Sequence, residues 1–219
     1  MKHPILTMEE LSDEFYQVSA LDLPELSRSR IWIFDLEATG LDTTVERVTQ
    51  IAGIPLESGV LLDDQAFTQL VYPGDGVEIP KVVQDLTGIT LERLDGAPLL
   101  PEAWAACVAA AGPADLWMGQ SVFEFDVPLL EAELARHGLP TELPPMLDTV
   151  VLATHLLGEP ERRWSTSALL QRFEVSIEGL RLSVEPRGRS LVERMLGFLG
   201  LDDPPGLQGY FDEACPSAR

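Results

Sequence analysis

The sequence has few of the residues that mark secreted, cysteine-rich or membrane-bound proteins. Only Cys107 and Cys215 are cysteines, too few for a disulfide framework or a cysteine-rich metal site. No apolar run approaches the roughly 20 residues of a membrane-spanning helix. Acidic residues follow the N-terminus at once, unlike in a signal or transit peptide. The sequence therefore predicts a cytoplasmic protein that does not contact a membrane.

Positive charge is also scarce. The 219 residues include 15 Lys and Arg against 36 Asp and Glu, a net charge of −21. Binding to nucleic acid draws affinity mainly from cations that displace counterions along the phosphates, so this composition argues against a non-specific duplex binder. Seven of the basic residues, at 162, 163, 172, 181, 187, 189 and 194, nevertheless fall in one C-terminal stretch. They indicate either a solvated helical face or a landing surface for an anion.

Hydrophobic patterning divides the chain into three parts. Residues 1–29 are predicted to form an acidic helical arm, because Met8, Leu11 and Phe15 recur at helical spacing before Pro24. Residues 30–200 contain the candidate core and are predicted to form the main domain. Residues 201–219 contain three prolines and few core candidates, which predicts a loosely held C-terminal tail.

The main domain is predicted to be an α/β domain with a mixed sheet covered by helices. The predicted strands lie at 31–37, 48–56, 65–72 and 116–118, and a further short strand leads into a helix within 146–157. The predicted helices lie at 98–111, 123–137, 166–173 and 190–199. Three early strands followed by alternating helices and short strands are typical of layered α/β architectures.

Two acids lie on the first predicted strand of this domain. Asp35 and Glu37 are two residues apart, so their side chains point to the same face of the strand. Buried carboxylates this close repel each other unless they are paired or bind a metal ion. A strand end that reaches solvent accommodates the same pair at little cost. The pair alone therefore leaves both interpretations open.

Four segments, in order, carry more information. They are IFDLEATGL at 33–41, TGIT at 87–90, GQSVFEFDVPLL at 119–130 and LDT at 147–149. Together they resemble the motifs of the DEDD family of 3′–5′ exonucleases. Thr87 stands where that family has a histidine, and Gln120 and Ser121 stand where it usually has His-Asn. The resemblance implies the ribonuclease-H-like fold, a mixed five-stranded sheet flanked by helices.

The resemblance also implies a site. In that family four carboxylates hold two divalent metal ions, which activate a water and steady the leaving oxygen. A His or Tyr takes the proton from this water. The matching positions give Asp35, Glu37 and Asp126 as catalytic residues and as ligands of Mg²⁺ or Mn²⁺. The substrate is then the 3′ end of single-stranded DNA or RNA, and the implied substrate-binding residues are Thr39, Gly40, Leu41 and Phe125.

The family's last motif is missing its key residues. It should supply the fourth carboxylate and the base, but residues 179–193 contain no His, Tyr or Asp. An arginine stands in place of the acid, Arg187 or Arg189 depending on the alignment. In one account Glu185 or Glu193 replaces the acid and slow hydrolysis survives. In the other an arginine reaches into the acidic group in place of metal.

These features predict a member of the 3′–5′ exonuclease family with weak or lost catalysis. The alternative is an inactive module that uses the same fold to bind a protein partner through its acidic surfaces. His155 lies seven residues after Asp148 and is interpreted either as a displaced base or as a structural residue.

Overall fold

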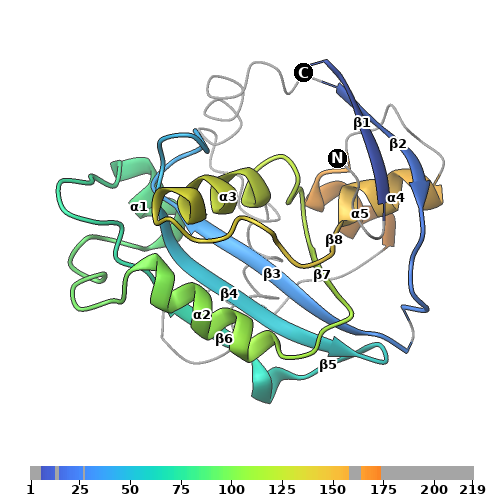
Figure 1. Ribbon diagram of the computed structural model, residues 1–219, viewed down its shortest axis with the longest axis horizontal. Helices are drawn as coiled ribbons and strands as arrows, with labels where there is room; N and C mark the ends of the chain where they lie inside the picture. The colour runs from blue at the N-terminus through green and yellow to red at the C-terminus, as the bar shows by residue number, and fades with distance from the viewer. Residues whose placement is uncertain (1–5, 13–14, 27, 158–163, 174–219) are drawn as a thin grey trace.

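The computed structural model describes residues 6–12, 15–26, 28–157 and 164–173 (Figure 1). Its main feature is a sheet of six strands: β3 (Arg30–Ala38), β4 (Val48–Glu57), β5 (Val60–Leu61), β6 (Phe67–Leu70), β7 (Leu116–Gly119) and β8 (Met146–Asp148). The order is β5-β4-β3-β7-β8, and β6 also pairs with β4. The predicted α/β fold with a mixed sheet is confirmed.

The sheet is mixed because its two halves run in different senses. β4 is antiparallel to β3, whereas β7 and β8 run parallel to it. β5 pairs with β4 at residues 56–57, and β6 pairs with β4 at residues 50–53. These two short strands share one edge of β4, so the sheet is five strands wide, as predicted.

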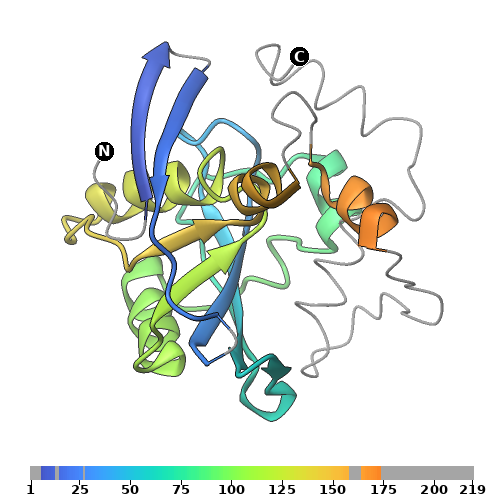
Figure 2. The ribbon, with the colours of Figure 1, turned by 90° about the vertical axis from the view of Figure 1, so that its right-hand side faces the viewer.

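Helices cover both faces of the sheet. They are α1 (Lys81–Thr87), α2 (Leu100–Ala111), α3 (Asp126–Arg136), α4 (Thr149–Leu157) and α5 (Thr166–Phe173). Figure 2 shows α2 and α3 on one side of the sheet and α5 on the other. Leu152 of α4 packs against Ile31 and Leu147 on the face away from α2 and α3. Among the described residues, none of the helices combines the length and the apolar character needed to cross a membrane.

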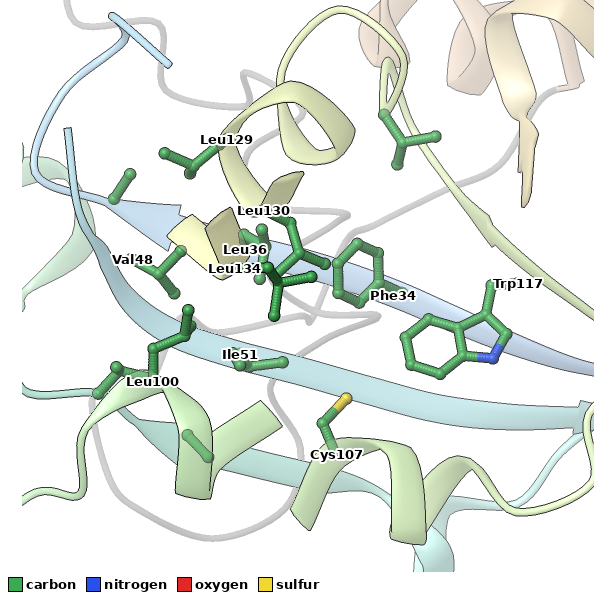
Figure 3. Packing of buried hydrophobic residues seen from close by; sticks show 14 of the residues in the cluster. Phe34, Leu36, Val48, Ile51, Leu100, Cys107, Trp117, Leu129, Leu130 and Leu134 are labelled. Atoms are coloured by element: carbon green, nitrogen blue, oxygen red, sulfur yellow. The ribbon is translucent and has the colours of Figure 1, made fainter. Parts of the chain in front are cut away.

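The main core lies between the sheet and the pair α2 and α3. Trp32, Phe34 and Leu36 alternate along β3 and all face this layer. Figure 3 shows Phe34 and Leu36 among side chains from both helices, including Leu100, Cys107, Leu129, Leu130 and Leu134. Because neighbouring side chains on a strand point to opposite faces, the residues between them, Asp35 among them, face away from this core.

The prediction of a helical N-terminal arm is wrong. Residues 6–21 form an antiparallel hairpin of β1 (Leu6–Ser12) and β2 (Phe15–Leu21), with Ser12 opposite Phe15. Only three apolar residues in this segment recur at helical spacing, which is weak support for a helix. β2 in contrast contains an aromatic pair and Val18, which favour an extended chain. Local spacing did not reveal that the two halves of this segment pair with each other.

Several element boundaries also differ from the predictions. The third strand is shorter than predicted, because a 3₁₀ turn at Asp63–Gln65 precedes β6. α1 was not predicted, and it ends at Gly88, which has a φ of 66°. The helix predicted at 166–173 is confirmed. The helix predicted at 190–199 and the tail at 201–219 lie outside the described residues.

Candidate active site

Asp35 and Glu37 lie near the end of β3, on the face opposite α2 and α3. Both side chains are half-buried. β7 pairs with β3 only over residues 31–33, so the last part of β3 has no strand on that edge. The end of the central strand therefore carries two carboxylates where a further residue can approach the backbone from the β7 side.

Asp126 approaches there. It is the first residue of α3 and only 4% exposed. The backbone N–H of Leu36 donates a hydrogen bond of 2.9 Å to Asp126 Oδ1. Leu36 lies between Asp35 and Glu37, so this bond brings a third carboxylate to the same strand end. We call Asp35, Glu37 and Asp126 the carboxylate site.

The electrostatics of Asp126 are unfavourable for its charged form. Burial raises the pKa of Asp126 well above its usual range, and the nearby charge of Asp35 raises it further. The hydrogen bond from Leu36 acts in the opposite direction. A cation between Asp35 and Asp126 would relieve this repulsion. Two neighbouring carboxylates, one of them buried with a raised pKa, are the environment expected of a metal-binding pair.

The donor set fits a hard divalent cation in its chemistry, since carboxylate oxygens are the ligands of Mg²⁺ and Mn²⁺. Its geometry fits less completely. In the part of the chain that the structure describes, no three acidic, His or Cys side chains lie close enough together to share one metal ion. Asp35 and Asp126 are thus the centre of the candidate site. Arg187 and Arg189, the predicted metal-replacing cations, lie outside the described residues.

A tight turn connects β7 to α3 and places Asp126. Gly119 lies so close to β3 that a Cβ there would be 2.6 Å from the carbonyl oxygen of Phe34. Ser121 follows with a φ of 53°, a left-handed conformation that few residues other than glycine and asparagine adopt. Phe125, a predicted substrate-binding residue, is half-buried and packs against the main core.

Asp148 fixes this turn, a role that was not predicted. Its side chain is 1% exposed and accepts hydrogen bonds from the backbone N–H groups of Ser121, Phe123 and Val150, at 3.1, 3.1 and 2.7 Å. Burial raises the pKa of Asp148 to about 6, although the three amides lower it. An Asp-Thr pair at the start of a helix is a signal for such a cap, because a carboxylate accepts the unpaired N–H groups there.

The connection after β3 contains the other predicted substrate-binding residues. Thr39 is buried, and its backbone N–H donates to the carbonyl of Arg47 at 2.9 Å. Gly40 lies under the side chain of Glu46, whose Oε1 would be 2.5 Å from an added Cβ. Leu41 is half-buried. The structure places all three directly beside the end of β3, next to Glu37.

His155, the candidate for a displaced base, and Gln120 differ in their surroundings. His155 is exposed on α4. Gln120 stands where the DEDD exonucleases usually have His, and it links three segments. Its Nε2 donates to the carbonyl of Trp164 at 2.9 Å, and its Oε1 accepts from Thr149 Oγ1. Gln120 therefore holds the segments around the site together.

The sheet order and the helices on both faces define the ribonuclease-H-like class of α/β proteins. The family model RNase_T, described as an exonuclease, matches residues 32–179. This chain therefore belongs to that exonuclease family, as a DEDD-type member of the ribonuclease-H-like superfamily. The match ends where the stretch of the missing last motif begins.

Individual relatives agree with this assignment. The chain is 29% identical over 154 residues to the PolC-type DNA polymerase III of Streptococcus sanguinis strain SK36, covering 70% of this chain but only 10% of that protein. Exonuclease X, solved with 5′ overhanging duplex DNA, has a TM-score of 0.54 at 16% identity, covering 78% of this chain and 90% of that one.

A further structural neighbour is E. coli exonuclease I, solved with a dA16 oligonucleotide. It has a TM-score of 0.51 at 18% identity, and the match covers 61% of this chain and 31% of that one. At these identities the two structures support the fold alone. The chain spans about a tenth of the length of its polymerase relatives.

Proposed function

We propose that this chain binds the 3′ end of single-stranded DNA or RNA at the carboxylate site, in the cytoplasm, and that its hydrolysis is weak or lost. The observation that carries the proposal is the hydrogen bond from Leu36 to Asp126, which holds a buried carboxylate between Asp35 and Glu37. A buried carboxylate beside a like charge is costly unless it serves to bind a cation.

The carboxylate site would hold Mg²⁺ or Mn²⁺, with Asp35 and Asp126 as the central ligands and Glu37 beside them. A bound ion of this kind polarises a phosphodiester and makes a bound water more acidic. The chain's own contribution is orientation. The Leu36 amide fixes Asp126, and the connection with Thr39, Gly40 and Leu41 offers its backbone to the terminal nucleotide, with Phe125 nearby.

The proposal of weak or lost catalysis rests on residues 179–193, which contain neither the Asp nor the His or Tyr of the family's last motif. Losing a general base typically lowers a rate by about 10²–10⁴-fold. Two accounts remain. A displaced glutamate leaves slow hydrolysis, whereas Arg187 or Arg189 paired with the carboxylates would replace the metal and abolish it.

Calorimetric titration with Mn²⁺ tests the site directly. We expect the wild type to bind Mn²⁺ and Asp35→Ala to lose that binding. Asp64→Ala, a change at an exposed acid far from the end of β3, serves as the matched control and should bind like the wild type.

Binding and cleavage of a 3′-labelled single-stranded DNA decamer and its RNA counterpart are then measured. A wild type that binds neither Mn²⁺ nor these oligonucleotides would refute the proposal.

A second candidate is an inactive exonuclease-fold module that binds a protein partner. The observation that favours it is the arginine, Arg187 or Arg189 depending on the alignment, in place of the fourth acid. The variant Arg187→Asp/Arg189→Asp distinguishes the two. If only this variant binds Mn²⁺, the arginines occupy the site in the wild type and the module is the better account. If both bind alike, the metal-binding account stands.

A further inference from the structure

Glu133 is a buried acid that the carboxylate site does not use. It lies on α3, two turns after Asp126, and is 2% exposed. A separation of seven residues returns to the same face of a helix, about 10.5 Å further along its axis. One face of α3 therefore carries two buried carboxylates, one at each end.

The two carboxylates bind neighbouring strands, Asp126 to β3 and Glu133 to β4. Asp126 accepts the backbone N–H of Leu36 in β3, and Glu133 Oε2 accepts the backbone N–H of Val48, the first residue of β4, at 3.3 Å. α3 thus lies over the end of β3 and the start of β4 (Figure 1). The connection 39–47 leaves the sheet between these two attachment points.

Arg136 extends this attachment into the connection itself. Its guanidinium donates to Glu133 Oε1, to the carbonyl of Thr44 at 3.0 Å and to the carbonyl of Glu46 at 3.3 Å. Arg47 Nε lies 3.9 Å from the same Glu133 oxygen. We call Glu133 and Arg136 the α3 clamp, because both hold residues 44–48 against the helix.

The connection is also closed at its base. Thr39 and Arg47 exchange two hydrogen bonds, Thr39 N–H to the Arg47 carbonyl at 2.9 Å and Arg47 N–H to Thr39 Oγ1 at 3.0 Å. The Thr39 hydroxyl donates to Glu46 Oε2, and the Glu46 side chain covers Gly40. Residues 39–41 therefore depend for their position on residues 44–48, which the α3 clamp holds.

We propose that Glu133 and Arg136 are positioning residues, which fix the 39–47 connection relative to Asp126 and so preshape the place where the 3′-terminal nucleotide binds. The identity of the ligand in this inference rests on the proposed function, whereas the clamp itself rests on the hydrogen bonds of Glu133 and Arg136. A buried ion pair adds little stability compared with apolar packing of the same volume. A clamp that sets geometry is therefore a better account of Glu133 than a contribution to stability.

The first measurement is amide hydrogen exchange of the folded protein, which needs neither metal nor substrate. Arg136→Met keeps the aliphatic part of the side chain but loses the bonds to Glu133, Thr44 and Glu46. We expect exchange in residues 40–47 to rise roughly tenfold or more above any uniform rise, which α2 and β7 report and which the unpaired Glu133 carboxylate would cause. Arg136→Lys should be intermediate, and Glu131→Gln on the same helix should be silent.

The second measurement is the equilibrium Kd for the 3′-labelled decamer with Mn²⁺, counted per folded molecule. Arg136→Met should weaken binding about as much as it loosens the connection, and Arg136→Lys should recover part of the loss. If Glu133→Gln folds, it should weaken decamer binding as much as Arg136→Met does. If it does not fold, the Arg136 variants still test the clamp, because the Arg136 side chain is partly exposed and its replacement is better tolerated.

The outcomes separate the two proposals. Unchanged exchange at 40–47, or a uniform rise over the whole chain, would overturn the clamp, because either result indicates an ordinary structural residue. A local rise with no decamer binding even by the wild type would leave the clamp standing and refute the proposed function. A local rise with unchanged Kd would refute the role of the clamp in nucleotide binding.

Discussion

Ser121 keeps a backbone conformation that costs free energy for most side chains. Its φ of 53° lies in the left-handed region, just before the turn that places Asp126. Among the described residues, the Ser121 hydroxyl has one polar contact, a long one of 3.4 Å from Gln120 Nε2. The conformation therefore comes from the surrounding structure, including the hydrogen bond of its backbone N–H to Asp148.

Ser121→Gly should accordingly raise the free energy of unfolding. Removing the strain of a left-handed residue gives about 1–3 kcal/mol, partly offset by about 0.5–1 kcal/mol from the greater freedom of glycine in the unfolded chain. Urea denaturation followed by circular dichroism measures the change. Ser121→Ala, which also loses the hydroxyl but still has a Cβ, serves as the control and should not stabilise the protein. Equal effects of both variants would contradict the explanation.

Asp148 should make stability depend on pH. Its pKa in the folded protein is about 6, above the ordinary value of about 3.9 for an unfolded chain. Between these values the folded state holds the proton more tightly, so the contribution of Asp148 to the unfolding free energy falls as the pH rises from about 4 to about 6. The difference amounts to about 3 kcal/mol.

Asp148→Asn removes that titration. The unfolding free energies of the wild type and the variant should therefore be compared at pH 4.5 and at pH 7.5. We expect the advantage of the wild type to be larger at pH 4.5. An advantage that is independent of pH would show that Asp148 is not the titrating group, since Asp126 is present in both proteins.

At the scale of elements, the contact between β7 and β3 depends on Gly119. A Cβ there would meet the Phe34 carbonyl at 2.6 Å and Val122 Cγ1 at 2.4 Å. Gly119→Ala should therefore lower the free energy of unfolding by about 1–3 kcal/mol. It should also weaken Mn²⁺ binding, because the same turn leads to Asp126.

The double variant Gly119→Ala/Val122→Ala tests which contact matters. It removes the clash with the side chain but not the clash with the β3 backbone. If the backbone contact dominates, as its fixed position suggests, the double variant stays at least as unstable as the single one. Recovery to wild-type stability would place the cause in Val122 instead.

The sequence predicted the central elements well for a physical reason. β3 is rich in β-branched and aromatic residues, and this local composition depends only on neighbours in the sequence. The pairing of β1 with β2 depends instead on contacts between two segments, and the apolar spacing there matched a helix by chance. Asp35, Glu37 and Asp126 were predicted by resemblance, and the structure places Asp126 between the other two along β3.

Glu133 could not be predicted in the same way. An acid in the middle of an amphipathic helix usually faces water. Its burial results from Val48, Arg136 and Arg47, which come from a strand, the helix and the connection between strands. Only the folded arrangement of all three shows that the side chain is enclosed.

At the scale of the whole molecule, the net charge of −21 limits how nucleic acid can bind. Each phosphate neutralised on a single strand contributes about −0.7 to the slope of log Kobs against log salt concentration. We expect a shallow slope, no steeper than about −2, and a loss of decamer affinity when Mn²⁺ is removed. Fluorescence anisotropy between 50 and 300 mM NaCl, which spans roughly the range where this effect is measurable, provides the values.

A steep slope that persists without Mn²⁺ would contradict this expectation. It would assign binding to the arginine-rich C-terminal stretch as a landing surface for phosphates, in place of the carboxylate site. Asp35→Ala separates the two interpretations, because it should leave such a landing surface intact.

The hydrogen bond from Leu36 to Asp126 has a consequence for how this protein evolves. Replacing Asp126 with an apolar residue would leave a buried backbone N–H without an acceptor, which costs about 1–3 kcal/mol. Selection for folding alone would therefore retain an acceptor at position 126, which Asn supplies as well as Asp, in a lineage that no longer cuts nucleic acid. Asp35 and Glu37, which are half-buried, are freer to drift, so they are the more sensitive record of whether descendants kept the chemistry.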